Sequence, residues 1–389
     1  MSATDGTITT ARSPFALLRD ADEAEEVLLL TYTASLEFFE RFALGEARGL
    51  QAATTVISDA AMVTVDPLTV RGAGVRYIEA RAVCPGHAAF HPKLLVIVGR
   101  SACSIAVGSG NVTLAGWHGN DELWTVIRAD VDRGPRTARE ASAFLRALAS
   151  GPIQLSAEAP EVLTRVATLV DGMAADDPGP ALVSTLDGPM IQQLPRGPVD
   201  ELVVYAPFFD SRLAALDALQ ERLAPSRTTV FVQPQTSVDG NALAAWLARR
   251  QAELKWCSDE RYRHGKLIEW SREGVREALT GSPNLSGAAL LHRLGADPGR
   301  RVNCELATIT RIPESLAPPE AALPPMASRA WCSPPIRQKR RARGPFSLGP
   351  LWWMGSRFIC ASRPTSQAQH ESRPTTRTAT GRPFRGSRS

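Results

Sequence analysis

Several short sequence elements occur twice in this chain, in the same order. The two copies run from His91 to Ile127 and from His264 to Ile309. In each copy a His-x-Lys triplet is followed, eighteen residues after its lysine, by the asparagine of a Gly-Ser-x-Asn turn, and an Asn-x-Glu triplet comes next. Recurrence of several elements in one order indicates an internal duplication. The chain is therefore expected to fold as two similar lobes.

The recurring polar residues are the candidates for a functional site. Only four of the 44 basic residues of the chain are lysines, and two of these four follow a histidine by two positions. A chain that nearly always uses arginine has kept lysine at these two places, which favours a specific role for it. The recurring residues are His91, Lys93, Ser109, Asn111 and Glu122 in the first copy, and His264, Lys266, Ser282, Asn284 and Glu305 in the second.

The pattern of apolar residues predicts an α/β fold. Short β-rich runs alternate with segments of helical periodicity, such as the helix expected over 35–50. Such alternation is typical of a buried mixed sheet with helices on its faces. We expect two pseudo-symmetric lobes, each with a mixed sheet flanked by helices. The expected divisions are a first lobe over 1–134, a helical connector over 135–195, a second lobe over 196–315 and a tail over 316–389.

The net charge of +4 averages two parts of opposite sign. Residues 326–389 hold 13 basic residues and one acid, a charge of +12, which leaves −8 on the other 325 residues. This Pro- and Arg-rich segment has no sustained helix or strand period, so we expect disorder, with RQKRRAR as a polyanion contact. The abrupt change in composition is equally explained by an out-of-frame coding end. Neither interpretation gives the segment a catalytic role.

Targeting and redox signals are weak in this sequence. No apolar run approaches the roughly 20 residues that span a membrane, and the first residues contain no apolar signal core. The six cysteines show no CxxC spacing, so neither a zinc site nor a disulfide framework is indicated. We expect a cytoplasmic protein without a transmembrane segment.

The spacing of the motif residues predicts a binding site for a phosphodiester anion. Residues i and i+2 of a strand share a face, so His91 and Lys93 would project together, as would His264 and Lys266. An imidazole, an ammonium and an amide from each of two lobes could bind the phosphoryl oxygens. One histidine could attack phosphorus while the other protonates the leaving oxygen. Two lysines and two asparagines would supply the neutralising charge, so no metal or cofactor is expected.

Two His-x-Lys triplets, each followed by Gly-Ser-x-Asn, resemble the phospholipase D superfamily. The usual aspartate five residues after the lysine is replaced by Val98 and Ser271. That departure, the long gap from lysine to asparagine, and the segments 109–118 and 284–289 are similar to the tyrosyl-DNA phosphodiesterase-like branch. The resemblance implies a phospholipase D-like duplicated fold and a phosphohistidine intermediate, with no cofactor. A monomer would suffice for a complete active site.

The resemblance also implies roles for the recurring residues. His91 would be the nucleophile and His264 the general acid, although the near symmetry of the motifs leaves the order open. The lysines and asparagines would bind phosphoryl oxygens, and Glu122 and Glu305 would hold the histidine rings in the required tautomer. Ser109 and Ser282 could donate to phosphate or shape the turns.

Three functions are consistent with these motifs. The first is a nucleic-acid phosphodiesterase, either a nuclease or a DNA end-processing enzyme of repair or defence, with DNA or RNA as substrate. The −8 charge of residues 1–325 argues against it, because a nucleic-acid groove should be basic. The second is a phospholipase, or another hydrolase or transferase of small phosphodiesters. The third is a non-catalytic nucleic-acid-binding subunit of a larger complex. Retention of both complete motif sets favours an enzyme, a phosphoric diester hydrolase.

Overall fold

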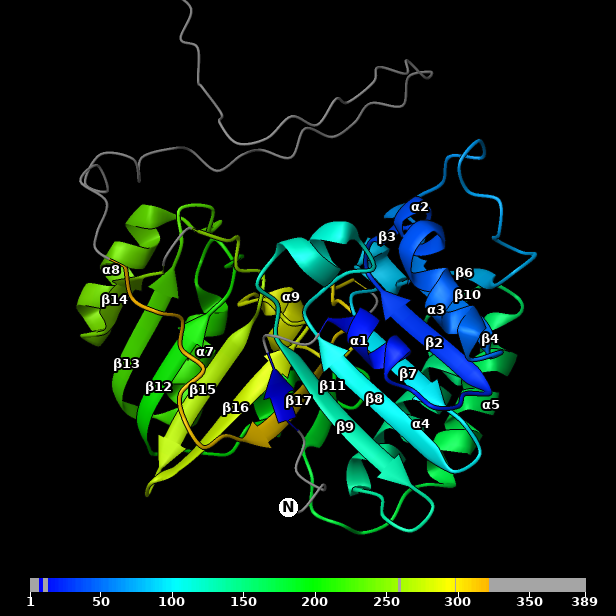
Figure 1. The fold of residues 1–389 in the computed structure, drawn as a ribbon. Coiled ribbons are helices and arrows are strands. Elements are labelled where there is room, and N and C mark those ends of the chain that lie inside the picture. The colour runs from blue at the N-terminus through cyan, green and yellow to red at the C-terminus, as the bar shows by residue number, and fades with distance from the viewer. Residues whose placement is uncertain (1–6, 10–12, 258–259, 298, 322–389) are drawn as a thin grey trace, which may run out of the picture. The chain divides into compact units, whose positions relative to one another are not determined.

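Two large β-sheets organise the computed structural model, which describes residues 7–9, 13–257, 260–297 and 299–321. Within these residues the first sheet has eight strands and lies in the first half of the chain (Figure 1). Its strands are, in spatial order, β1 (Thr7–Thr9), β9 (Trp124–Asp130), β8 (Ala102–Gly108), β7 (Leu94–Val98), β2 (Glu26–Thr31), β4 (Ala53–Asp59), β6 (Ile78–Val83) and β10 (Gln154–Leu155).

The second sheet repeats this order. Figure 1 shows β13, β12, β15 and β16 as adjacent arrows that run from green to yellow. The seven strands described are, in spatial order, β11 (Ala181–Ser184), β17 (Leu306–Arg311), β16 (Val275–Gly281), β15 (Leu267–Arg272), β12 (Val199–Tyr205), β13 (Pro225–Val232) and β14 (Glu253–Trp256). A small parallel pair, β3 (Ala34–Ser35) and β5 (Val63–Thr64), completes the described sheets.

The strand pairing confirms the predicted duplication of a mixed sheet. In the first sheet β2 pairs with β4 in parallel and with β7 in antiparallel. In the second sheet β12 pairs with β13 in parallel and with β15 in antiparallel. The central strand β2 is buried at all six positions, as expected for a strand covered on both faces. Leu94 and Leu267, which each follow a histidine by three residues, occupy the same place in the two sheets.

Helices flank both sheets. The predicted helix over 35–50 is present as two α-helical pieces joined by the π-helical turn η1, in which Phe39 and Ala43 are buried. The described helices are α1 (Pro14–Arg19), α2 (Leu36–Phe38), α3 (Leu44–Gly49), α4 (Arg136–Ser150), α5 (Ala159–Asp171), α6 (Met190–Gln193), α7 (Ala214–Leu223), α8 (Gly240–Arg250) and α9 (Gly287–Leu290), with the turns η1 (Phe39–Ala43), η2 (Pro85–His87) and η3 (Ala115–Gly119).

The connector helices α4 and α5 are part of the core of the first lobe. Phe144 of α4 and Val166 of α5 belong to the same buried apolar cluster as Leu28 of β2 and Val96 of β7. Every described residue falls within one compact unit, Met1–Ile336. Among the described residues no helix is long and apolar enough to cross a membrane. The predicted tail lies outside the described residues from 322 onward, and the predicted domain boundaries stay predictions.

The lobes meet at a seam that contains three buried threonine hydroxyls. Thr125 of β9 and Thr280 of β16 bring their Oγ1 atoms to 3.0 Å. Thr308 of β17 donates to Thr125 Oγ1 at 2.8 Å. All three threonines are fully buried, so each hydroxyl has its partner inside the protein, as buried polar groups require. The seam therefore holds β9 of the first lobe against β16 and β17 of the second.

The first glycine of each Gly-Ser-x-Asn turn has no room for a side chain. A Cβ at Gly108 would lie 2.3 Å from the Trp124 ring, and one at Gly281 would lie 2.6 Å from Ala307 Cα. Gly281 also has a φ of +149°, which residues with a side chain rarely adopt. Gly281→Ala is therefore expected to lower the free energy of unfolding by about 2 kcal/mol or more. Urea denaturation monitored by fluorescence would measure the change.

The matched control is Gly45→Ala in helix α3. No atom lies within 4 Å of a Cβ built at Gly45. Alanine favours a helix over glycine by about 0.5 to 1 kcal/mol, so this variant should be as stable as the wild type or more stable. Equal stability of the Gly281→Ala and Gly45→Ala variants would contradict the steric argument.

Candidate active site

Both His-x-Lys triplets lie immediately before a strand rather than within one. Their spacing predicts that they lie on strands, but β7 begins at Leu94 and β15 begins at Leu267. The reason is that the histidine of each triplet pairs with the other lobe instead of with its own sheet. His91 N donates to Cys304 O at 2.9 Å, and Cys304 N donates to Ala89 O at 2.9 Å.

The second triplet is paired in the same way. His264 N donates to Asp121 O at 2.9 Å, and Asp121 N donates to Tyr262 O at 2.9 Å. Cys304 and Asp121 each directly precede the glutamate of an Asn-x-Glu triplet. Each histidine segment is therefore held beside the glutamate segment of the opposite lobe.

Each histidine ring is bound by the glutamate of the other lobe. His91 Nδ1 lies 2.8 Å from Glu305 Oε2, and His264 Nδ1 lies 3.0 Å from both carboxylate oxygens of Glu122. An ionised carboxylate can only accept, so Nδ1 carries the proton in each ring. This arrangement leaves Nε2 of each histidine as the atom available to a substrate.

The two serines of the repeated turns hold these glutamates. Ser109 Oγ donates to Glu122 Oε2 at 2.6 Å, and Ser282 Oγ donates to Glu305 Oε2. Both serines are fully buried. Of the two roles considered from the sequence, donation to phosphate and shaping of the turn, neither describes this contact. The serines orient the carboxylates that orient the histidines.

The asparagines of the Asn-x-Glu triplets hold the other oxygen of each glutamate. Asn120 Nδ2 donates to Glu122 Oε1 at 3.2 Å, and Asn303 Nδ2 donates to Glu305 Oε1 at 3.0 Å. The sequence analysis used these asparagines to recognise the repeat but gave them no role. Their recurrence two residues before each glutamate was the available signal.

Both motif lysines are buried beside their histidines. Lys93 is 0% exposed and its Nζ donates to His91 O at 2.8 Å. Lys266 is 1% exposed, its Nζ donates to His264 O at 2.6 Å, and the same atom lies 3.0 Å from His264 Nε2. Burial lowers the pKa of both ammonium groups, that of Lys266 to about 8. Glu122 and Glu305 oppose this shift and favour the charged lysines.

The two motif asparagines are supported differently. Asn111 Oδ1 accepts from Thr33 N at 3.3 Å, which leaves the amide NH₂ group as the donor of this side chain. Gly108, at the start of the same turn, donates its N–H to Lys93 O at 3.0 Å and so ties the turn to the lysine. Asn284 Oδ1 is buried and has no hydrogen-bond partner among the described residues.

Burial favours neutral histidines in this cluster, and the surrounding charges favour ionised glutamates. Burial lowers the pKa of His91 to about 4 and also lowers that of His264. The nearby lysines act in the same direction, whereas Glu305 and Glu122 oppose the shift. Burial alone would raise the pKa of Glu122 and Glu305, but the histidines and lysines around them hold both below the ordinary value. Near neutral pH the cluster therefore contains two carboxylates and two neutral rings.

Two tyrosines that the sequence analysis did not single out lie beside the histidines. The Tyr32 ring centroid is 4.9 Å from that of His91, and Lys93 Nζ is 5.5 Å from the Tyr32 centroid. The Tyr262 ring centroid is 6.1 Å from that of His264. Tyr32 lies outside the repeated segments and Tyr262 has no tyrosine counterpart in the first copy, so neither could be recognised by repetition.

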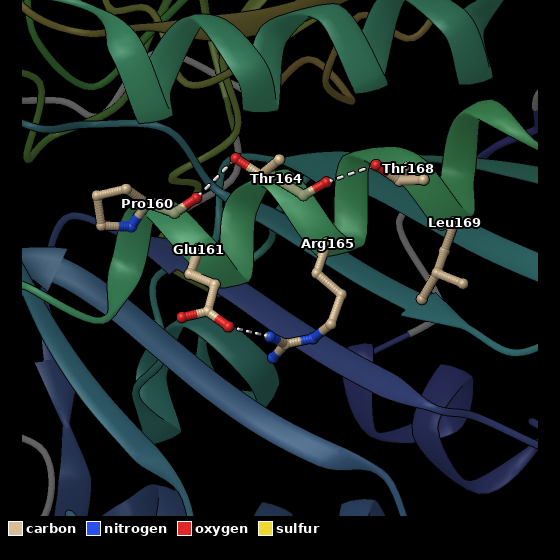
Figure 2. Close-up of a pocket in the computed structure, with 6 residues that line it drawn as sticks. All are labelled: Pro160, Glu161, Thr164, Arg165, Thr168 and Leu169. Atoms are coloured by element: carbon tan, nitrogen blue, oxygen red, sulfur yellow. Dashed lines mark hydrogen bonds and ion pairs between the residues drawn. The ribbon is translucent and has the colours of Figure 1, made fainter.

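No group of three or more His, Cys, Asp or Glu side chains in the described part of the chain is arranged to hold a metal ion. A hollow of about 560 Å³ is lined by residues of α5 alone, and Figure 2 shows these side chains. Its threonine hydroxyls donate to carbonyl groups of the preceding turn. The lining residues are Pro160, Glu161, Thr164, Arg165, Thr168 and Leu169.

The low pKa of His91 makes the stability of the fold depend on pH. Histidine in an unfolded chain has a pKa of about 6.5, against about 4 for His91 in the folded protein. Between these values the unfolded state binds more protons, so stability is lost as the pH falls. The free energy of unfolding is expected to drop by roughly 1.5 kcal/mol from His91 alone between pH 6.5 and 5. Urea denaturation across this range measures the slope.

Two variants separate this effect from general acid sensitivity. The pH window ends above the usual range of carboxyl groups, so glutamates and aspartates contribute little to it. His91→Asn should flatten the slope, whereas His118→Asn should leave it unchanged because His118 is exposed. An unaltered slope in the His91→Asn variant would contradict the assignment.

Comparison with solved structures finds this fold in yeast tyrosyl-DNA phosphodiesterase. The likeness covers 79% of this chain and 89% of the yeast chain, with 10% identity and a TM-score of 0.53. A histidine-to-asparagine mutant of the yeast protein matches with a TM-score of 0.54, 10% identity and coverage of 79% and 90%. Phosphatidylserine synthase from Haemophilus influenzae Rd KW20 matches with a TM-score of 0.48, 10% identity and coverage of 77% and 79%.

The sequence itself matches no protein-family model and no curated protein. At identities near 10% the structural likeness concerns the fold alone. The expectation drawn from the repeated His-x-Lys and Gly-Ser-x-Asn motifs is confirmed at this level: the chain has the phospholipase D-like duplicated fold that is found in tyrosyl-DNA phosphodiesterase.

Proposed function

We propose that this chain is a phosphodiesterase that acts on nucleic acid through a phosphohistidine intermediate, without a metal. One observation carries the proposal, namely the two reciprocal histidine–glutamate pairs that are buried between the lobes beside two buried lysines. The two buried lysines place positive charge beside both histidines, where a phosphoryl anion can bind. The Nε2 atoms, which the glutamates leave unbound, are the groups that a two-step displacement at phosphorus needs.

In the first step His91 Nε2 attacks phosphorus. A P–N bond forms, the P–O bond to the leaving group breaks, and the protonated His264 gives its Nε2 proton to the leaving oxygen. His91 suits the nucleophilic role because burial lowers its pKa to about 4, which keeps the ring neutral. Glu305 then stabilises the positive charge that the phosphorylated ring acquires.

In the second step water resolves the intermediate. His264 Nε2 accepts a proton from the water, whose oxygen forms a new bond to phosphorus while the P–N bond breaks. His91 is released as the neutral ring and His264 is again protonated. Glu122 and the bound phosphate anion favour the protonated form of His264, against the effect of burial.

The lysines and asparagines would bind the non-bridging phosphoryl oxygens. Lys266 Nζ lies 3.0 Å from His264 Nε2. A phosphoryl group placed between the two histidines would therefore bring one of its oxygens close to this ammonium group. The NH₂ group of Asn111 is the donor that its contact with Thr33 leaves available. Charge-assisted hydrogen bonds of this kind stabilise the charge that develops during displacement.

The choice of nucleic acid as substrate rests on two supports. The fold is shared with an enzyme whose name states a tyrosyl-DNA substrate. Arginines also lie near both histidines. Burial raises the pKa of Tyr32, whose ring is beside His91, and Arg301 opposes this shift. Arg263 directly precedes His264 and forms an ion pair with Asp121 at 3.2 Å. The net charge of −8 on residues 1–325 opposes the choice and leaves phospholipids or other small phosphodiesters as the competing substrate class. The complete set of reacting groups in both lobes supports catalysis over binding alone.

The substrate class can be tested with the purified full chain in the presence of a chelator. It would be offered single-stranded DNA, DNA with a 3′ adduct, a chromogenic phosphodiester and phosphatidylcholine. Chelator-resistant cleavage of the DNA substrates is expected. Turnover of phosphatidylcholine alone would favour the lipid hypothesis, and DNA binding without turnover would favour a binding subunit.

The covalent intermediate can be tested by substitution and acid quenching. His91→Asn and His264→Asn should each lower kcat by between about a hundredfold and ten-thousandfold, because each removes a reacting group. His118→Asn is the control and should retain wild-type kcat, since His118 is exposed. In the His264→Asn variant substrate phosphate should accumulate on His91. Absence of labelled phosphate on both histidines would exclude the covalent mechanism.

A further inference from the structure

Each histidine segment is held by one more side chain of its own lobe. This side chain lies at the end of the strand that pairs in parallel with the central strand, β4 in the first lobe and β13 in the second. Asp59 Oδ2 accepts from Phe90 N at 2.7 Å, and Gln233 Oε1 accepts from Arg263 N at 3.0 Å. Phe90 and Arg263 directly precede His91 and His264. Neither Asp59 nor Gln233 belongs to a repeated motif, and neither touches the histidine ring in the contacts described above.

The sheet register shows that these two residues are equivalent. Leu30 of β2 lies opposite Ile57 of β4, and Asp59 follows Ile57 by two residues. Tyr205 of β12 lies opposite Phe231 of β13, and Gln233 follows that residue by two.

The same register links these strands to the histidine segments. Leu30 also lies opposite Leu94, and Tyr205 lies opposite Leu267. Leu94 and Leu267 each follow a motif histidine by three residues. The duplication has therefore kept a hydrogen-bond acceptor at one structural position while its chemical identity changed from carboxylate to amide.

Both side chains are fixed by further hydrogen bonds. Asp59 is 7% exposed, and its second oxygen, Oδ1, accepts from Ala61 N at 2.9 Å. Gln233 is 2% exposed, and its Nε2 donates to Arg263 O at 2.7 Å. The Gln233 backbone N–H donates to Thr236 Oγ1 at 2.9 Å. An acceptor that is held in this way can fix the position of the backbone N–H group that donates to it.

At each histidine two successive backbone N–H groups are bound, the first by its own lobe and the second by the other lobe. Phe90 N donates to Asp59 within the first lobe, whereas His91 N donates to Cys304 O of the second lobe. In the second segment Arg263 N donates to Gln233, and His264 N donates to Asp121 O of the first lobe. The backbone at each histidine is thus held both by its own lobe and by the other lobe.

We propose that Asp59 and Gln233 are positioning residues, Asp59 for the nucleophile His91 and Gln233 for the acid His264. This inference rests on the proposed function. Asp59 acts through the backbone amide that precedes His91, and Gln233 through the one that precedes His264. The neutral Gln233 locates His264 without opposing the release of its proton.

The leaving group of the substrate separates the two assignments. A nitrophenyl ester needs little protonation of its leaving oxygen, whereas an alkyl ester or DNA needs the acid. Asp59→Ala is expected to lower kcat for both kinds of substrate by about tenfold to a hundredfold, because the nucleophile is misplaced. Because His264 also acts as the base of the second step, its role as acid is read from the single-turnover rate of leaving-group release. Gln233→Ala is expected to lower that rate for the unactivated substrate by a similar factor, and for the nitrophenyl ester by less than about threefold.

Matched variants separate positioning from loss of structure. Asp59→Asn keeps an acceptor for Phe90 N and should recover most of the activity that Asp59→Ala loses. Asp66→Ala removes an aspartate that caps an exposed turn, where it accepts from Leu68 N, and should leave both substrates at the wild-type rate. If an alanine variant does not fold, Asp59→Glu and Gln233→Asn replace it. These displace the acceptor by one methylene and should give the same pattern with at least about a threefold effect.

The outcomes are distinguishable from failure of the proposed function. A wild-type chain that turns over neither substrate refutes the proposed function itself. An active wild type, together with folded alanine or methylene-shifted variants that keep the wild-type kcat, overturns the positioning roles. An equal loss on both substrates in Gln233→Ala overturns the assignment of Gln233 to the acid.

Discussion

Two lysines, two histidines and two glutamates are buried together between the lobes, and the rest of the structure depends on their mutual compensation. An unpaired charge in a protein interior costs several kcal/mol, and Lys93 and Lys266 are 0% and 1% exposed. Each lobe supplies one lysine and one glutamate, but each glutamate binds the histidine of the opposite lobe. A lobe on its own would leave its half of the cluster exposed to solvent or without the compensating groups of the other lobe. The charge compensation within the cluster and the association of the lobes therefore depend on each other.

Because the lobes are duplicated, both histidine–glutamate pairs are supported by the same few kinds of hydrogen bond. In both lobes the chain that leads to the glutamate forms backbone hydrogen bonds with the segment that leads to the opposite histidine, as Cys304 does with Ala89. In both lobes a serine and an asparagine occupy the two carboxylate oxygens of the glutamate. These pairs leave each glutamate with a single orientation, because both of its oxygens are used. The geometry of one half-site is then reproduced by the other through the same hydrogen bonds.

The repeated motifs were sufficient to predict the mixed α/β lobes and the residues that meet in the cleft. They could not show which glutamate binds which histidine, because that depends on how the lobes associate. They also could not assign Ser109 to Glu122, since a turn serine is equally suited to bind phosphate. Comparison of the two repeated segments could not identify Asp59 and Gln233, for a different reason. They are equivalent in sheet register but different in chemical type, and repetition of residue letters cannot reveal them.

The two half-sites are alike in the groups that would touch a substrate and differ in the groups behind them. Asn111 Oδ1 is held by Thr33 N, whereas Asn284 Oδ1 has no hydrogen-bond partner among the described residues. A carboxylate supports one histidine segment and an amide supports the other. A symmetric site would give both histidines the same proton affinity, although displacement at phosphorus needs one ring as nucleophile and the other as acid. Under the proposed mechanism, divergence of the supporting residues would break that symmetry while the histidines, lysines and asparagines of the motifs are retained.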